Sequence, residues 1–333
     1  MPETVTAFGP GRVNLIGEHT DYNDGLAMPF AITRGVTVTA TPADRFTVDA
    51  LDLGEQDAFT TPESAEGWKA FARGMVAELR AAGFEVAPAH LTITGDVPLG
   101  SGLSSSAALE AALAYALMAG EVGEDLKQLA KICSKVENTW VGAQTGLLDQ
   151  IASLMSEREH VLRIDFRTLD VDAHPLELGD WQLVTVESGA THTHAGSGYN
   201  QRRAECNQVM EQLGISSMRD ATLEGLDGVL LKRARHVITE NERVNATAQA
   251  LQRHDLEEVG RLLDASHASL RDDYEASVPE VEETRDALKA AGAAGARMVG
   301  GGFGGSVLAL LPPGVARPAG ALAVTPGAPA RLL

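Results

Sequence analysis

Cysteine is scarce in this chain: Cys133 and Cys206 are the only two among 333 residues. They are isolated from each other and form no Cys-x-x-Cys pair, so we interpret both as buried reduced thiols. Long apolar runs are also missing, since none approaches the roughly eighteen residues that a membrane span needs. Residues 1–8 lack the basic and apolar segments of a signal peptide. We therefore expect a cytoplasmic protein with no membrane partner.

Basic residues are few compared with acidic ones. The chain has 27 Lys and Arg against 46 Asp and Glu, which gives a formal net charge of −19. Such acidity argues against nucleic acid or an anionic membrane as a partner, so phosphate binding would depend on local dipoles, arginine and metal. The length and the 44% hydrophobic content allow a sizeable core and predict about two domains.

A Walker A motif is absent, although one segment has the chemistry of a phosphate loop. Residues 98–107 contain Gly100, Gly102 and four serines but lack the Gly-Lys-Ser/Thr ending. The segment runs into residues 107–120, which are rich in alanine and leucine and favour a helix. Backbone N–H groups and the positive end of a helix dipole both favour phosphate at such a place. We predict an anion-binding loop; the alternative is an ordinary serine N-cap.

The densest polar segment is residues 9–25, which holds one arginine, one histidine, three carboxylates and four glycines in seventeen residues. We interpret it as a binding site rather than a core strand. Glu18, His19 and Asp21 offer several hydrogen-bond acceptors and one donor, which suits a polyhydroxylated ligand. The alternative is a polar loop capped by Asx turns at residues 23–25.

A third segment, residues 300–307, matches the bare glycine patterns of dinucleotide-binding proteins and of protein kinases. Neither context fits, because residues 306–311 read as a strand followed by proline, and no His-Arg-Asp or Asp-Phe-Gly motif occurs. We predict a loop that brings backbone close to another backbone or to a ligand.

Two carboxylates lie among apolar neighbours. Glu137 falls on the apolar stripe of a helix predicted at residues 124–143. A buried carboxylate needs a partner, so metal ligation competes with an internal salt bridge or simple exposure at the edge of the stripe. Asp149 lies within the apolar segment 146–155 and is a candidate functional residue; the alternative is an aspartate favoured by the dipole of a helix's first turn.

Hydrophobic patterning predicts a mixed order of helices and strands. The predicted strands are residues 34–41, 46–51, 91–95, 181–187 and 306–311. Besides the helices named above, the predicted helices are residues 66–82, 197–213, 230–254, 256–272 and 278–291. The stretch from Pro312 onward is rich in Ala, Pro and Gly and is expected to fray.

Together, residues 9–25, 98–107 and 300–307 resemble the three signature motifs of the GHMP small-molecule kinases. The first motif in chain order, residues 9–25, is close to the signature of the galactokinase family. The likeness continues in order at residues 188–189, 199–206, 233–237, 240–244 and 266–274. It implies an α+β fold of two lobes with the active site between them. The first lobe would span residues 1–178, with the sugar motif, the phosphate loop and the catalytic aspartate. The second would span residues 179–333, a ferredoxin-like α+β lobe with the third glycine motif.

The resemblance also implies roles for particular residues. Arg12 and Asp149 would form the catalytic pair, and Asp149 would contact the sugar. The other sugar-binding residues would be Glu18, His19, Thr20, Asp21, Gly146 and Tyr199. The triphosphate would be wrapped by Gly100, Ser101, Gly102, Leu103, Ser104, Ser105 and Ser106. Ser106 and Glu137 would hold Mg²⁺, and Glu137 lies twelve residues before Asp149, the spacing that the family shows.

The implied reaction is ATP-dependent phosphorylation of D-galactose at the C1 hydroxyl, the entry step of Leloir galactose metabolism, with Mg²⁺ as the metal. We expect small-molecule substrates only, no nucleic acid, and a monomer. Two alternatives stay open: a kinase for N-acetylgalactosamine or another pyranose, and a regulatory protein that binds sugar and ATP without turnover. The second is disfavoured because all three motifs are intact.

Overall fold

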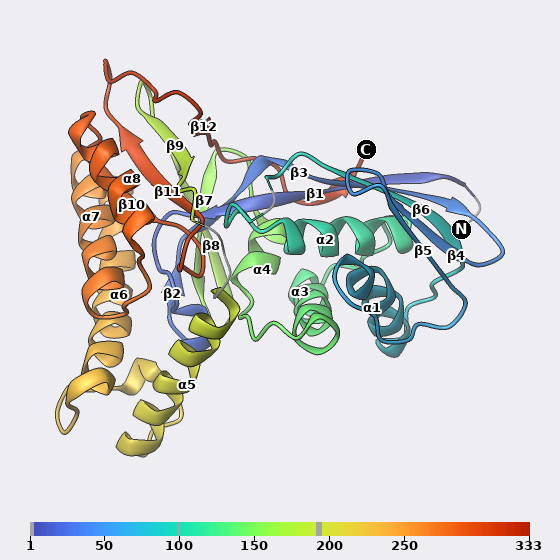
Figure 1. Ribbon diagram of the computed structural model, residues 1–333, viewed down its shortest axis with the longest axis horizontal. Coiled ribbons are helices and arrows are strands. Elements are labelled where there is room, and N and C mark those ends of the chain that lie inside the picture. The colour runs from blue at the N-terminus through green and yellow to red at the C-terminus, as the bar shows by residue number, and fades with distance from the viewer. Residues whose placement is uncertain (1–2, 99, 191–194) are drawn as a thin grey trace.

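One lobe is built on a long sheet with helices on one of its faces (Figure 1). The structure, a computed structural model, describes residues 3–98, 100–190 and 195–333. The strand order is β13-β1-β3-β6-β4-β5, with β4 and β6 parallel and the other neighbours antiparallel. The strands are β1 (Val5–Asn14), β3 (Pro29–Pro42), β4 (Phe46–Ala50), β5 (Glu55–Phe59), β6 (Ala89–Gly95) and β13 (Arg331–Leu332). The helices are α1 (Trp68–Ala81), α2 (Ser105–Leu117), α3 (Leu126–Lys135) and α4 (Leu148–Met155), with a π-helical turn over Val136–Val141.

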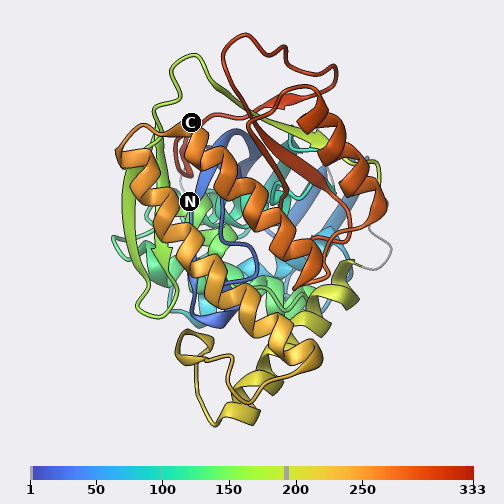
Figure 2. The same cartoon turned by 90° about the vertical axis from the view of Figure 1, so that its left-hand side faces the viewer.

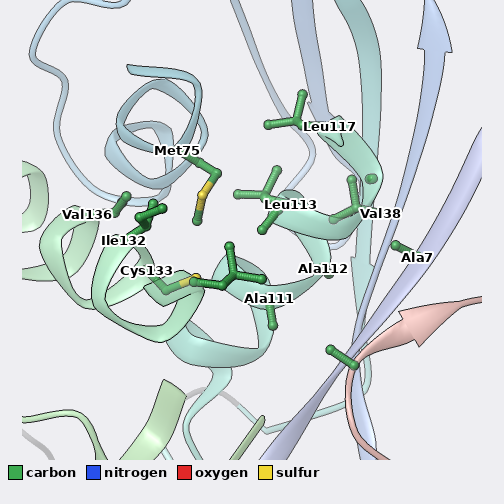
Figure 3. Close-up of a cluster of buried hydrophobic side chains, with 14 of the residues drawn as sticks. Ala7, Val38, Met75, Ala111, Ala112, Leu113, Leu117, Ile132, Cys133 and Val136 are labelled. Atoms are coloured by element: carbon green, nitrogen blue, oxygen red, sulfur yellow. The ribbon is translucent and has the colours of Figure 1, made fainter. Parts of the chain in front are cut away.

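The core of this lobe lies between the sheet and α2. Figure 3 shows Ala7 and Val38 of the sheet facing the alanine-rich α2, with side chains of α1 and α3 on its other side. The approach of β1 to α2 is very close, because a Cβ atom on Gly9 would lie 2.0 Å from the carbonyl oxygen of Ala108. Small residues on both elements therefore bring β1 directly against the helix that follows the predicted phosphate loop.

The first motif corrects one of our interpretations. Residues 9–14 belong to β1, a largely buried strand that pairs with β3, and Val13 is fully buried. The register against β3 shifts between Pro10 and Arg12, and such irregularities redirect side chains beside functional sites. The motif is thus both a core strand and a site. Its glycines and proline obscured the alternating pattern by which a strand is recognised.

The second lobe carries a four-stranded antiparallel sheet of order β10-β11-β9-β12. Its strands are β9 (Gln182–Glu187), β10 (Gly295–Met298), β11 (Ser306–Leu311) and β12 (Leu322–Ala323). Its helices are α5 (Ala195–Leu213), α6 (Gly228–Gln252), α7 (Leu256–Asp272) and α8 (Pro279–Ala290). Figure 2 shows α6 and α7 side by side along this lobe. A small sheet of β2 (Leu26–Ala27), β7 (His160–Asp165) and β8 (Asp170–Pro175) lies between the lobes and contacts α6.

The two lobes share a hydrophobic core. Val13, Ile16 and Phe30 from the first lobe belong to the same buried cluster as Val244 and Leu308 from the second. The architecture is therefore the predicted α+β fold of two lobes, and apolar burial holds the lobes together at the place where the motifs meet.

The end of the chain differs from the expectation that it frays. Leu332 pairs with Ala7 of β1 and packs against Gly120, and the Ala330 amide donates to the Ser153 carbonyl at 2.8 Å. Pairing with a strand near the beginning of the chain orders a segment whose composition favours disorder. The last residues thus join the sheet of the first lobe, while the division of the chain at residue 178 stays a prediction.

Cys133 and Cys206 are both buried free thiols, as predicted. Every helix in the described ranges is too short or too polar to span a bilayer.

Candidate active site

Three cavities lie in a row, and β1, α2 and the glycine segment of the second lobe, residues 300–307, meet at the middle one. The first, here called the acidic cavity, has a volume of about 290 Å³ and is lined by the carboxylates of Glu18, Asp21 and Asp149. It shares Arg12 and Asp149 with a serine cavity of about 320 Å³, which is lined by residues 100–106. The serine cavity in turn shares its last two serines with an apolar cavity of about 350 Å³.

Arg12 and Asp149 form an ion pair between the first two cavities. Nε and Nη2 of Arg12 lie 2.7 and 2.6 Å from Oδ1 of Asp149, and Nη1 donates to the Gly102 carbonyl at 2.6 Å. Ser104 donates to the other oxygen of Asp149. Burial by itself lowers the pKa of Arg12, but the charges of Asp149 and Glu18 outweigh it and the pKa is raised. Arg12 is thus a permanent cation that orients the carboxylate of Asp149.

The predicted phosphate loop, residues 100–106, wraps around the beginning of α2. Its backbone turns repeatedly into the left-handed region, with φ values of 74° at Gly100, 75° at Gly102 and 58° at Ser104. The Leu103 side chain is buried in the shared core, and its carbonyl accepts from the Arg12 amide at 3.0 Å. Because α2 begins at Ser105, the N–H groups of its first turn have no acceptor within the helix. The predicted anion cradle is therefore geometrically available.

The glycine segment of the second lobe covers this loop. A Cβ atom on Gly102 would lie 3.1 Å from the Val299 carbonyl oxygen, and one on Gly300 would lie 3.3 Å from the Gly102 carbonyl oxygen. The hydroxyl of Ser306 donates to the Ser101 carbonyl at 2.7 Å. The segment thus lets one backbone approach another closely, as its composition predicts.

Glu137 is buried beside the phosphate loop, in the π-helical turn that follows α3. Thr145 and Gln150 donate to its Oε2 at 2.8 and 3.0 Å, and the hydroxyl of Ser106 lies near the same carboxylate. Burial raises the pKa of Glu137, and the negative charge of Asp149 adds to this. A carboxylate and a hydroxyl are hard oxygen ligands of the kind Mg²⁺ takes. The described residues contain no cluster of three or more His, Cys, Asp or Glu side chains with metal-site geometry.

Asp21 is a partly buried carboxylate of the first motif. It lines the acidic cavity, where burial raises its pKa to about 7 and the charge of Asp149 adds to the shift. Gly146 lies directly against it, because a Cβ atom on Gly146 would be 2.0 Å from Oδ2 of Asp21. The absence of a side chain at residue 146 therefore makes room for the carboxylate.

His19 and Tyr199 also line the acidic cavity, but the polar atoms of His19 are already used. Its Nε2 lies 3.2 Å from the Gly301 carbonyl, an acceptor, and its Nδ1 lies 2.8 Å from the hydroxyl of Tyr22. Burial lowers the pKa of His19 to about 3, so the ring is neutral. The rings of His19 and Tyr199 lie 5.2 Å apart. Together they give the cavity an aromatic wall, and both ring nitrogens of His19 already have partners within the protein.

Thr20 is the one predicted sugar residue that lies outside the cavity. It is fully buried, and its hydroxyl contacts the carbonyls of Gly17 and Leu26 at 2.8 and 2.7 Å. Its role in this geometry is to hold the loop of the first motif. Arg12, Glu18, His19, Asp21, Gly146, Asp149 and Tyr199 all line the acidic cavity.

Sequence reasoning missed the residues of the second lobe that support the first motif. Glu240 of α6 accepts from the Gly17 amide at 3.0 Å, and Asn241 accepts from the Leu26 amide at 2.7 Å. Arg297 of β10 bonds Glu18 at 2.6 Å. Two signals were available in the sequence. Glu240 and Asn241 belong to the family likeness at residues 240–244, and Arg297 is a single charge between apolar residues and a glycine-rich segment.

Comparison with known families agrees with this geometry. Family models for the "GHMP kinases N terminal domain" and the "GHMP kinases C terminal" match residues 70–157 and 247–324. The crystal structure of a Methanococcus jannaschii mevalonate kinase shares the fold at a TM-score of 0.67 and 16% identity, covering 93% of this chain and 92% of that one. Fold and site thus define a GHMP kinase.

More specific matches concern one branch of that class. The "Galactokinase galactose-binding signature" matches residues 2–42. Galactokinases of Thermotoga petrophila and Mycobacterium bovis are 42% and 43% identical over 90% and 94% of this chain, and over 87% and 91% of their own lengths. The crystal structure of Lactococcus lactis galactokinase complexed with galactose matches with a TM-score of 0.91 and 33% identity, covering 100% of this chain and 96% of that one. The chain belongs to the galactokinase family.

Proposed function

We propose that this protein transfers the γ-phosphoryl group of ATP to the C1 hydroxyl of D-galactose, which yields galactose 1-phosphate and ADP. The observation that carries this proposal is the position of Arg12 and Asp149, which line both the acidic cavity and the serine cavity. A sugar in the first cavity and a triphosphate in the second would meet at this ion pair.

The acidic cavity supplies acceptors for sugar hydroxyls. Asp21 and Asp149 are carboxylates that line it, and Glu18 accepts its protein hydrogen bonds through Oε1, which leaves Oε2 for a ligand. Tyr199 and His19 would cover the apolar face of the pyranose ring. Because buried acceptors left unpaired cost free energy, such a site rejects a sugar whose hydroxyl points the wrong way.

The other two cavities suit the nucleotide. The phosphates would lie against the backbone of residues 100–106 and the first turn of α2, where N–H groups favour an anion. The base would enter the apolar cavity, which is lined by Trp68, Phe71 and Leu109 and joins the serine cavity at Ser105 and Ser106.

Phosphoryl transfer needs mainly positioning and stabilisation of charge. Asp149 would orient the attacking C1 hydroxyl and accept its proton, and Arg12 would keep Asp149 ionised while stabilising charge on the transferring group. Ser106 and Glu137 would hold Mg²⁺, and their oxygens fit that hard cation. When bound, the metal neutralises charge on the phosphate oxygens.

The test is a coupled assay of ADP release with D-galactose, D-glucose and N-acetylgalactosamine as acceptors. We expect kcat/KM for D-galactose to exceed that for D-glucose by a factor on the order of 10⁴, because the two sugars differ only at C4. A higher kcat/KM with N-acetylgalactosamine than with D-galactose would show that the substrate assignment is wrong, while the assignment as a sugar kinase would stand. Sugar and ATP binding without ADP release would instead favour the regulatory alternative.

We further propose that the protein works as a cytoplasmic monomer with small molecules as its only partners. The net charge of −19 supports the absence of a nucleic-acid partner. Light scattering coupled to gel filtration should give a mass near 35.0 kDa. A mass of twice that value would overturn the monomer.

A further inference from the structure

We propose that Arg297 is a positioning residue for sugar recognition, which acts by setting the carboxylate of Glu18. Arg297 lies in β10 of the second lobe, is fully buried and does not line the acidic cavity. The inference rests on the proposed sugar-kinase function. Arg297 lies outside the acidic cavity but sets the orientation of the Glu18 carboxylate, which is one of the acceptors that line the cavity.

The geometry around Glu18 is asymmetric. Nη2 of Arg297 donates to Oε1 of Glu18 at 2.6 Å, and the Gly300 amide donates to the same oxygen at 2.8 Å. No described residue donates a hydrogen bond to Oε2, and Glu18 lines the acidic cavity. Two donors on one oxygen therefore fix the rotation of the carboxylate and leave the other oxygen for a ligand.

Arg297 is itself held in place by both lobes. Its backbone pairs with Leu308 in the four-stranded sheet, and its Nη2 also donates to the Asn14 carbonyl at the end of β1, at 3.0 Å. The guanidinium thus ties the second-lobe sheet to the strand that carries Arg12. Arg297 therefore contacts both Glu18 and the end of β1 through the same nitrogen.

Stability alone is a weak reason for this ion pair. Taking two charges out of water is costly, and well-packed apolar residues often stabilise a core equally well. Nε and Nη1 of Arg297 are buried and have no hydrogen-bond partner among the described residues. A buried arginine with such incomplete pairing is better explained by the orientation that it imposes on Glu18 than by the energy that it contributes.

The experiment measures galactose binding by calorimetry, without nucleotide, for the wild type, Arg297→Met and Arg297→Lys. Methionine keeps an unbranched apolar side chain but donates nothing, so we expect the Kd for galactose to rise by about tenfold to a hundredfold, the worth of a charge-assisted hydrogen bond. Lysine retains the charge and a donor, and should recover part of the loss. The KM for ATP should stay within about twofold, because ATP does not contact Glu18 in the proposed arrangement.

A double variant separates positioning from general damage. If Arg297 acts through Glu18, the combination Glu18→Gln/Arg297→Met should bind galactose no more weakly than Glu18→Gln alone. The matched control is Arg285→Met in α8, another largely buried arginine of this lobe, whose Nη2 lies 3.1 Å from Asp264. This control should leave the galactose Kd unchanged, and thermal unfolding of each variant monitors the fold.

The outcomes distinguish the two proposals. If the wild type binds galactose but forms no galactose 1-phosphate, the proposed function is contradicted. The positioning role is then still decided by the galactose Kd of the Arg297 variants compared with that of the wild type. An unchanged Kd in Arg297→Met, or effects of Arg297→Met and Glu18→Gln that simply add, would overturn the positioning role while the kinase function stands. An equal loss in Arg285→Met would also overturn it, since it would show a general effect of damaging this lobe.

Discussion

Asparagine in place of Asp149 is the sharpest perturbation of the proposed mechanism, because it removes a charge and a proton acceptor while keeping the shape of the side chain. In the wild type, Oδ1 receives both Arg12 bonds and Oδ2 receives the hydroxyl of Ser104. An asparagine can keep the first contact through its oxygen and donate to the Ser104 hydroxyl through its amide. The cavity should therefore retain its geometry, and galactose should still bind.

The expected loss in turnover follows from the role of a positioned base. Removing such a group costs roughly 10²- to 10⁴-fold in rate, equivalent to about 3–5 kcal/mol of barrier at 1.36 kcal/mol per decade. Breaking a buried ion pair costs about 3–5 kcal/mol of folding free energy. Asp149 keeps 25% exposure against 7% for Arg12, so the stability cost should fall below that range and lower the Tm by only a few degrees.

Three measurements on Asp149→Asn test this reasoning: galactose affinity by calorimetry, kcat by ADP release, and Tm. Near wild-type kcat would refute the assignment of Asp149 as the base. Arg12→Lys is the companion variant, because lysine cannot reproduce the contacts of Arg12 to both Asp149 and the Gly102 carbonyl. A small loss in Asp149→Asn with a large loss in Arg12→Lys would favour a purely electrostatic mechanism.

Three further predictions concern the metal and the sugar. Glu137→Gln should raise the Mg²⁺ concentration that gives half-maximal activity while unfolding stays cooperative; an unchanged Mg²⁺ titration would exclude Glu137 as a ligand. The pKa of Asp21 is raised from 3.8 to about 7, so stability should decline as pH rises between these values, whereas galactose affinity should increase as the carboxylate ionises. In Asp21→Asn, galactose affinity should no longer change with pH over this range, and the Tm measured above neutral pH should be higher than that of the wild type. A galactose affinity that depends on pH as in the wild type would contradict this. Gly146→Ala would place Cβ 2.0 Å from Oδ2 of Asp21, so the galactose KM should rise by about tenfold or more with little change in the ATP KM, and equal rises in both would argue against a local effect.

Local features of the sequence determined much of the secondary structure and most of the candidate site. The helix predicted at residues 256–272 and the strand predicted at 306–311 coincide with α7 and β11. Asp255 caps α7 by accepting from the Glu258 amide, a signal that lies within a few residues of the helix itself. The three motifs could be found in the same way, because glycine, serine and carboxylate chemistry is concentrated within each of them.

Contacts between distant parts of the chain decided the rest. Three features depend on partners far away in sequence. Arg12 lies in a core strand, Leu332 pairs with Ala7, and Arg297 donates to the carboxylate of Glu18. No local pattern predicts such pairings, because the free energy that orders them comes from burial and hydrogen bonding that exist only once the lobes have met. The sequence by itself therefore determined which groups could bind a sugar and a nucleotide. Only the tertiary structure decided which of their atoms remain available, as with the fully used nitrogens of His19 and the hydroxyl of Thr20.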